Sequence, residues 1–462
     1  MSLPGAASAP PVAISAAGGL VGDGDYPRPT IAWWSVVVFF LLYNVSYLDR
    51  QMLNLLVVPI RATLGISDFQ LSLLQGFGFA VFYTAVGVPI GWLVDHRPRR
   101  RIICLGLVLW SFAASACGLA MHYWQLALGR VGVSVGEATL APATYSLLSD
   151  IFPPGKLALP MSIMGTGASL GGALSAVIAG FVVDAVPPGG MELPVLGNLV
   201  GWQIALLLTG VPGLLFAPLI FTVPEPRRRG LTPVANTDTP DRPGRGEAGR
   251  YIWQRRRFYL AHFFGFGFYS MCNYGVTAWM PTFLMRHHHW SLKQAALTTG
   301  TVTLLAGVTG GALMGFVVDR WYSSGRRDAH LVFFAGCAIL QALCVAGAVL
   351  SPDPRMAIPF LVPQVAVASF TGVAGAALQI VTPGRMRGQV SAVYLLVFNL
   401  IGLGCGPSVV ALFTDFVFHD DSKVGWSLLL TFAIFAPIAA GLMLMAARAI
   451  RAGVVSAPPV QS

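Results

Sequence analysis

Four ionisable residues stand inside otherwise apolar stretches of this 462-residue sequence. Asp49 and Arg50 are adjacent in the run 31–60, and Arg130 and Glu137 lie seven residues apart in the run 123–148. A charge in a bilayer-crossing segment costs on the order of 3 kcal/mol or more, and such residues usually mark a pathway for ions or substrate. The alternative is a local ion pair that only stabilises the structure. We expect these four residues to carry the chemistry.

Carboxylates paired with guanidiniums suit the coupled binding of protons and anions. The proton affinity of a buried carboxylate depends on the charge and the water around it, so water reaching it from one side changes that affinity. We expect Arg50 to balance Asp49, its neighbour in the chain, and Arg130 to lie beside Glu137 or Asp49. Protonation of the carboxylate would then release a guanidinium, which can bind a carboxylate or phosphate through two hydrogen bonds.

The segments that position these residues are long and apolar. Charged residues make up 10% of the chain and hydrophobic residues 55%, whereas soluble domains have about a quarter charged. About twelve apolar runs are each long enough to cross a bilayer as a helix. The approximate runs are 31–60, 71–95, 102–121, 123–148, 158–184, 201–223, 258–285, 295–320, 330–351, 356–380, 389–418 and 425–447. The sequence predicts an all-α membrane protein of twelve transmembrane helices.

The second half of the chain repeats the first. Ser67-x-x-Gln70 and Ser291-x-x-Gln294 both read as helix-starting capping boxes, 224 residues apart. Parallel repeats of six spans are typical of one transporter architecture, which places the substrate site between the repeats near the membrane midplane. We therefore expect two six-helix bundles, 30–223 and 258–450, joined by a flexible linker, 224–257. Residues 1–29 and 451–462 are interpreted as tails, the first of them disordered.

The basic residues favour one orientation. If the N-terminus is inside, 22 of the 29 Lys and Arg lie in inner segments, five in outer loops, and Arg50 and Arg130 within spans. Positive charge prefers the cytoplasmic side, so we expect a multi-pass inner-membrane protein with both termini in the cytoplasm. The net charge of +10 follows from this topology and does not require a nucleic-acid partner. Besides its substrate we expect membrane lipids as partners, and a monomer.

Residues 91–100 read GWLVDHRPRR and resemble the loop signature of the major facilitator superfamily, G-x-L-A-D-R-x-G-R-K. His96 and Pro98 depart from it. The resemblance implies that Asp95 and a loop arginine such as Arg99 latch the inner side shut in the outward-facing state, and that Gly91 lets helices approach closely. Residues 315–320, GFVVDR, give a second copy in Gly315, Asp319 and Arg320. The sequence is identified as a member of this superfamily.

Two further stretches resemble the Spinster branch of that superfamily. They are Tyr47-Leu48-Asp49-Arg50-Gln51 and residues 136–142, GEATLAP. The anion–cation symporters of sugar acids and aromatic acids share the two charged pairs and compete as the nearest relatives. The resemblance implies proton-coupling carboxylates at Asp49 and Glu137 and substrate-facing arginines at Arg50 and Arg130, with Tyr47 beside them.

The second half offers neutral polar groups in place of charges. Position 273, which is 224 residues after Asp49, is an asparagine. We expect the first bundle to handle protons and charge and the second to supply polar contacts and shape. Each of these side chains could equally well form a hydrogen bond between two helices and not contact the substrate. The candidates are Asn273, Tyr274, Gln364 and Asn399, with Tyr269 and Gln379 further possibilities.

We expect a secondary transporter that works by alternating access, is coupled to protons, needs no other cofactor, and moves an amphipathic or lipid-like organic molecule. Small organic anions are the alternative substrate, and a substrate-sensing receptor on a transporter fold is the alternative role. The sequence has no P-loop and no metalloprotease helix. An intramembrane enzyme using Asp49 and Glu137 is less consistent with two matched loop signatures. His287-His288-His289 could bind a metal, but adjacent side chains point in different directions.

Overall fold

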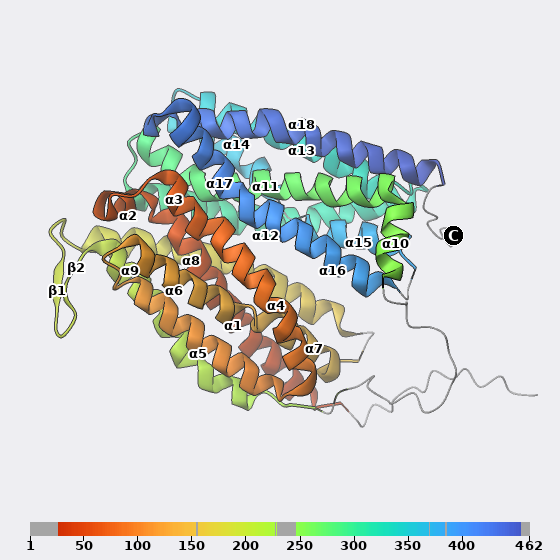
Figure 1. Cartoon of the computed structure of the whole chain (residues 1–462), viewed down its shortest axis with the longest axis horizontal. Coiled ribbons are helices and arrows are strands. Elements are labelled where there is room, and N and C mark those ends of the chain that lie inside the picture. The colour runs from red at the N-terminus through yellow and green to blue at the C-terminus, as the bar shows by residue number, and fades with distance from the viewer. Residues whose placement is uncertain are drawn as a thin grey trace, which may run out of the picture.

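The computed structural model describes residues 26–153, 156–226, 228, 246–368, 370–383 and 386–453. Helices form two bundles that lie side by side, red to yellow-green and green to blue in Figure 1. The N-terminal bundle comprises α1 (Pro29–Leu55), α2 (Val57–Leu64), α3 (Asp68–Ser72), the π-helix η2 (Leu73–Phe77), α4 (Gly78–His96), α5 (Arg99–Cys117), α6 (Tyr123–Glu137), α7 (Leu140–Ile151), α8 (Ala158–Ala185), α9 (Gly201–Phe216) and the 3₁₀ turn η4 (Ala217–Thr222).

The C-terminal bundle follows a short helix, α10 (Glu247–Gln254). It comprises α11 (Arg256–His287), α12 (Leu292–Ser323), α13 (Ala329–Leu350), α14 (Pro354–Ala366), α15 (Thr371–Val381), α16 (Arg387–Phe398), the π-helix η6 (Asn399–Gly404), α17 (Cys405–Leu412), the π-helix η7 (Phe413–Phe418), η8 (Asp421–Lys423) and α18 (Val424–Arg451). The part of the predicted flexible linker that α10 occupies is therefore helical. Residues 1–25 and 454–462 of the predicted tails lie outside the described residues.

The twelve predicted spans correspond to these elements. Within the described ranges, nine continuous helical segments are long and apolar enough to cross a membrane. The other three spans are α11 and two broken ones, α6 with α7 and α14 with α15. Pro359 and Pro363 lie inside α14 and remove backbone donors there, which weakens the helix ahead of the second break.

Both predicted capping boxes are present. Gln70 N donates to Ser67 Oγ at 3.1 Å and Gln294 N donates to Ser291 Oγ at 3.2 Å, and each glutamine side chain accepts from the serine N–H in return. The two helices that they start, α3 and α12, occupy matching places in the two bundles. This supports the internal repeat at the level of local structure.

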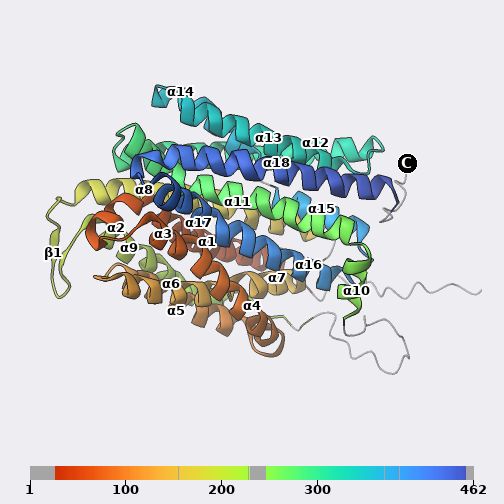
Figure 2. The same ribbon diagram turned by 45° about the horizontal axis from the view of Figure 1, so that its top comes forward.

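The two ends of the molecule differ. A two-stranded antiparallel hairpin, β1 (Met191–Leu193) and β2 (Gly197–Leu199), projects at one end, and α10 lies at the other (Figure 1). We call these the hairpin end and the linker end. The view in Figure 2 shows the same side-by-side bundles from another direction.

The bundles pack against each other from the hairpin end to the middle. One apolar cluster contains buried residues of both bundles, including Met52 of α1 and Trp279 of α11. A methyl group added at Gly76 of η2 would lie 2.6 Å from the carbonyl oxygen of Leu403 of η6, and one at Gly300 of α12 would lie 2.5 Å from Ala176 Cβ of α8. These close approaches require glycine, and they hold the two halves together.

Candidate functional site

The four intramembrane charges form two ion pairs between α1 and α6. Arg50 Nη2 lies 2.5 Å from Glu137 Oε2, and Arg130 Nη1 lies 3.0 Å from Asp49 Oδ2. The predicted pairing of Arg50 with Asp49 is therefore wrong, while the expectation that Arg130 lies beside Glu137 or Asp49 holds for Asp49. Neighbours in a helix project about 100° apart, so Asp49 and Arg50 reach different points on α6.

Exposure separates the two pairs. The side chains of Asp49 and Glu137 are each 1% exposed, and that of Arg130 is 4% exposed, whereas Arg50 is 16% exposed. Thr209 of α9 also donates to Asp49 at 3.3 Å, so a third helix holds the inner pair. Of the two substrate-facing arginines that the resemblance implies, Arg50 is therefore the more accessible.

Aromatic rings surround the accessible arginine. The guanidinium carbon of Arg50 lies 4.6 Å from the centre of the Phe79 ring, 5.3 Å from that of Tyr47 and 5.8 Å from that of Tyr83. Such rings attract a cation through their faces and exclude water from it. Tyr274 of α11 packs against the apolar cluster that contains Phe79. The predicted residues Tyr47 and Tyr274 are thus brought together around Arg50, from opposite bundles.

Several polar atoms of the site lack partners among the described residues. They include Glu137 Oε1, Arg130 Nε and Arg130 Nη2, all buried. An unpartnered buried acceptor costs free energy, and the same atom is a position at which a proton can be added. Glu137 Oε1 is therefore the carboxylate oxygen of the site that is open to a proton without breaking the bond to Arg50.

A pocket between the bundles opens beside this site. It is lined by residues of α1, α8, α11, α12 and α14. The polar members are Gln51, Asn54, Thr277, Thr299, Thr303 and Gln364, and the apolar ones include Leu55, Val276, Met280 and Leu361. Gln51 follows Arg50 directly in α1. A lining of this mixed kind suits an organic molecule that carries both apolar and polar groups.

The polar groups of the C-terminal bundle differ in what they contact. Asn273 and Gln341 exchange hydrogen bonds of 2.9 and 3.3 Å, and Asn273 also donates to Tyr269 O. This links α11 to α13, so Asn273 is engaged in helix–helix contact. Gln364 lines the pocket between the bundles. Asn399 begins the π-helix η6 and is half-buried.

The loop-signature residues at the linker end show no latch between the bundles. Asp95, Asp319 and Arg320 are exposed, and their side chains make no ion pair or hydrogen bond with any residue that the structure describes. A methyl group added at Gly91 or Gly315 would meet no heavy atom within 4 Å. The close helix approach predicted at these glycines is absent from this arrangement, because the bundles do not meet there.

Arg99 is engaged within the N-terminal bundle. It is 1% exposed, pairs with Asp150 of α7, and donates to the Ser146 carbonyl at 3.2 Å. Arg99 N also donates to Glu225 at 2.5 Å. These contacts tie the start of α5 to the end of α7 and to the segment after η4. Its role as an interbundle latch, implied by the resemblance, is not seen in this arrangement.

The hairpin end carries a cross-bundle network that the sequence analysis did not identify. Asp68 of α3 is fully buried and accepts two bonds from Arg286 of α11, at 2.6 and 2.8 Å. Arg61 lies 3.1 Å from Asp68 and 2.6 Å from Asp421. Asp415 accepts from the Phe69 N–H at 2.7 Å. We call Arg61, Asp68, Arg286, Asp415 and Asp421 the hairpin-end cluster.

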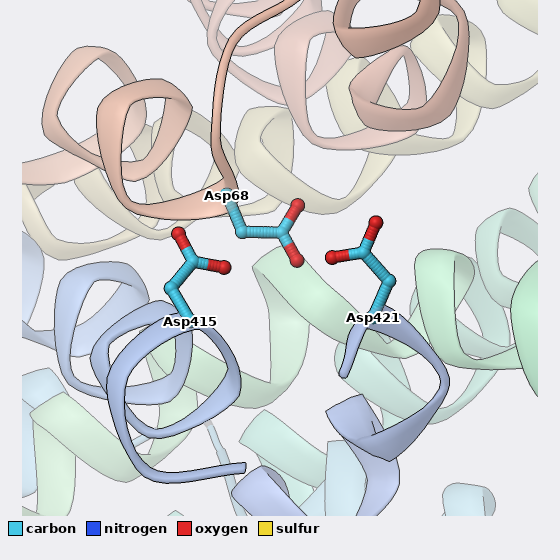
Figure 3. A group of neighbouring side chains, drawn as sticks. All are labelled: Asp68, Asp415 and Asp421. Carbon is cyan, nitrogen blue, oxygen red and sulfur yellow. The ribbon is translucent and has the colours of Figure 1, made fainter. Parts of the chain in front are cut away.

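The carboxylates of this cluster face one another. Figure 3 shows Asp68 from the N-terminal bundle opposite Asp415 and Asp421 from the C-terminal bundle. Their oxygens lie within 4.8 Å of one another, close enough to hold a metal ion, but Arg61 and Arg286 already supply the positive charge. The one sign of this cluster in the sequence was Asp68 at the start of a helix. Taken alone, an aspartate there is interpreted as a helix cap.

His287 and His288 of the predicted triplet pack against Phe283, with ring centres 5.2 Å away in each case.

Comparison with known proteins identifies the fold. The family model of the Major Facilitator Superfamily matches residues 39–407. The chain belongs to the Major Facilitator Superfamily. It is therefore a membrane transporter of that family, as the loop signatures predicted, and not an enzyme.

Curated relatives fall into three groups. The chain is 27% identical to an MFS-type efflux pump of Mycolicibacterium smegmatis over 431 residues, 92% of this chain and 94% of the relative. It is 24% identical to a hexuronate transporter of Bacillus subtilis over 416 residues, 87% and 92% of the two chains. It is also 24% identical to protein spinster homolog 1 of Mus musculus over 400 residues, 82% and 72%.

A solved structure is similar over nearly the whole chain. It is a bacterial homologue of the human lysosomal transporter Spinster in an inward-facing, unoccupied conformation, with a TM-score of 0.80 and 22% identity, covering 94% of this chain and all of that one. At this identity the likeness shows the fold. It agrees with the predicted twelve-helix architecture and with the Spinster-like resemblance.

Proposed function

We propose that this superfamily transporter couples protons to the movement of an amphipathic organic molecule through alternating access. The observation that carries the proposal is the pair of crossed ion bridges between α1 and α6. Glu137 is the coupling carboxylate, and Arg50 is the group that its protonation releases. Asp49, Arg130 and Thr209 form the more enclosed partner pair, which keeps α1 in place and supplies a second site for a proton.

The proposed cycle starts from the arrangement described above. We assign the linker end to the cytoplasm, as the distribution of Lys and Arg favours, so the transporter is inward-facing with the periplasmic end closed. Both termini are then cytoplasmic and the membrane is the inner one. Opening the other side requires the hairpin-end cluster to separate and the linker ends of the two bundles to meet.

The proposed substrate binds between the bundles. Its anionic group would contact Arg50 once Glu137 is protonated, through charge-assisted hydrogen bonds. Its apolar part would lie against the Leu55, Val276 and Met280 side chains of the pocket. Tyr47, Tyr274 and Gln364 complete the polar contacts. A lipid-like molecule with an acidic head fits this division between charge and apolar surface.

A small organic anion is the second candidate substrate. The relation to the hexuronate transporter favours it, since an arginine pair also suits a sugar acid. The two candidates differ in how much apolar surface the pocket must cover.

Transport by purified protein in liposomes tests the proposal. Counterflow of a labelled lysolipid and of a labelled sugar acid would be measured with and without a pH gradient. Accumulation driven by an inward proton gradient supports proton coupling, and the preferred label identifies the substrate class. Binding of either molecule without counterflow would favour a receptor role and overturn the proposal.

A further inference from the structure

A second cavity, unrelated to the space between the bundles, lies at the linker end of the N-terminal bundle. Its volume is about 650 Å³. The lining residues are His96, Arg97, Pro98, Arg99, Arg100, Arg101, Phe221, Glu225, Pro226 and Arg228. Five of these ten are arginines and one is an acid, so the cavity is strongly electropositive.

Part of this charge is already used by the protein. Arg99 is paired with Asp150, and Arg100 lies 3.1 Å from Glu225 Oε2. Arg228 donates to two backbone carbonyl oxygens, those of Val94 at 2.7 Å and Arg97 at 2.8 Å. These bonds hold the residues that line the cavity in place. Carbonyl groups carry no net charge, so they leave the charge of Arg228 uncompensated.

Two arginines remain for a ligand. The side chains of Arg97 and Arg101 are exposed and make no ion pair or hydrogen bond with the described residues. The cavity thus presents two guanidinium groups that have no partner among the described residues, an arrangement suited to phosphate.

The surface next to the cavity is apolar and exposed. Phe221 lines the cavity and is 51% exposed, and Trp92 lies one turn before His96 in α4 and is 61% exposed. Leu105, further along α5, is 71% exposed. Exposed apolar side chains close to a basic cavity suit a molecule with a phosphate head and acyl chains.

We infer that this cavity binds the headgroup of an anionic phospholipid in the leaflet that faces the linker end. The phosphate contacts Arg97 and Arg101, with Arg99, Arg100 and Arg228 behind them, and the acyl chains lie along Phe221 and Leu105. Basic pockets at the cytoplasmic surface are known to bind anionic headgroups in this way. The site differs in location and chemistry from the proposed substrate pocket, since it is lined by the N-terminal bundle and the start of the linker and has no residue of the C-terminal bundle.

Native mass spectrometry of the full-length protein in detergent tests the inference. The probes are phosphatidylglycerol, phosphatidylcholine with the same acyl chains, and glycerol phosphate, which has the headgroup without the chains. We expect saturable binding of phosphatidylglycerol at least about tenfold tighter than that of phosphatidylcholine. Equal binding of the two lipids would overturn the inference, and equally tight binding of glycerol phosphate would assign the cavity to a soluble phosphate compound.

Matched variants locate the site. Arg97→Gln with Arg101→Gln removes the two arginines that have no partner and should weaken phosphatidylglycerol binding about tenfold. Arg257→Gln with Arg327→Gln removes the same charge from exposed positions at the same end, outside the cavity, and should leave binding unchanged. An equal loss in both double variants would mean diffuse attraction and no site. Thermal unfolding of each variant, measured without lipid, confirms that the fold is retained.

Discussion

Arg50 pairs with Glu137 on α6, although Asp49 is its neighbour in the chain. The pairing leaves Asp49 to Arg130, so both bridges cross between the same two helices. Protonating one carboxylate would consequently loosen the contact between α1 and α6. It would not simply rearrange charge along one helix.

The crossed pairing predicts a specific pattern of stability. Removing one partner of a buried ion pair costs about 3–5 kcal/mol, because the other charge is left unpaired. Arg50→Gln and Glu137→Gln should each be destabilising, and the double variant should lose less than the sum of the two. Thermal unfolding in detergent measures this. As the control, Glu137→Gln with Asp68→Asn removes residues of two separate charge clusters and should be close to additive; the reverse pattern would contradict the crossed arrangement.

Glu137→Gln should abolish the pH dependence of transport while the protein still folds. Glutamine keeps the size of the side chain but carries no exchangeable proton, so the site stays in its neutral state. Initial transport rates between pH 5 and pH 8 test this in liposomes. Glu192→Gln, on the exposed hairpin, provides the isosteric control. A Glu137→Gln profile that matches that control would remove Glu137 from the coupling role.

Lysine substitution should distinguish the two arginines. Lysine keeps the charge but lacks the planar fork of donors. Because Arg50 is the more exposed of the two, Arg50→Lys should raise KM about tenfold, as expected for one lost charged hydrogen bond. Arg130→Lys should retain a near-normal KM. Transport assays at matched expression decide this, and the opposite order would return the anion-binding role to Arg130.

Asp68→Asn should open the hairpin end. The substitution takes the charge from a fully buried carboxylate that two arginines contact, and so weakens the cross-bundle cluster. A reporter cysteine at Ser408, whose hydroxyl lies 3.3 Å from that of Ser72 in the other bundle, should then react faster with an impermeant maleimide. Asp184→Asn breaks a more exposed cross-bundle pair with Lys293 and should have little effect. Equal labelling of the two variants would contradict a special role for the cluster.

Asp95→Asn and Asp319→Asn should have the opposite effect. Neither residue has a partner among the described residues here, so their expected contacts belong to the outward-facing state. Losing those contacts should favour the inward-facing state and slow labelling at the same reporter. Because His96 and Pro98 depart from the first loop signature, we expect Asp319→Asn to matter at least as much. Faster labelling would show that these aspartates do not act as latches.

Local signals in the sequence were sufficient for much of the fold. The capping boxes at Ser67 and Ser291 depend on residues three positions apart, so both could be predicted. The membrane spans could be predicted because each depends only on the length of one continuous apolar run. The helix α10 could not be predicted with equal ease, because its eight residues lie among arginines in a segment that reads as a linker.

The candidate site was predictable in its members and not in its contacts. Asp49, Arg50, Arg130 and Glu137 stand out because charge is costly in lipid. Which carboxylate meets which arginine depends on the rotation of α1 against α6, and sequence spacing does not define that rotation. The hairpin-end cluster was missed for a related reason, since Arg61 and Arg286 look like ordinary loop charges until the two bundles are placed together.

The crossed bridges lie wholly within one bundle, and the residues that the second bundle contributes to the pocket are all uncharged. Under the proposed function, the proton-binding residues therefore all belong to one bundle, whereas the pocket for the cargo is lined by both. Substitutions in α11, α12 and α14 would then change the pocket without touching either ion bridge. A chimera that keeps residues 26–226 and takes its second half from a relative should retain its pH response while changing its cargo.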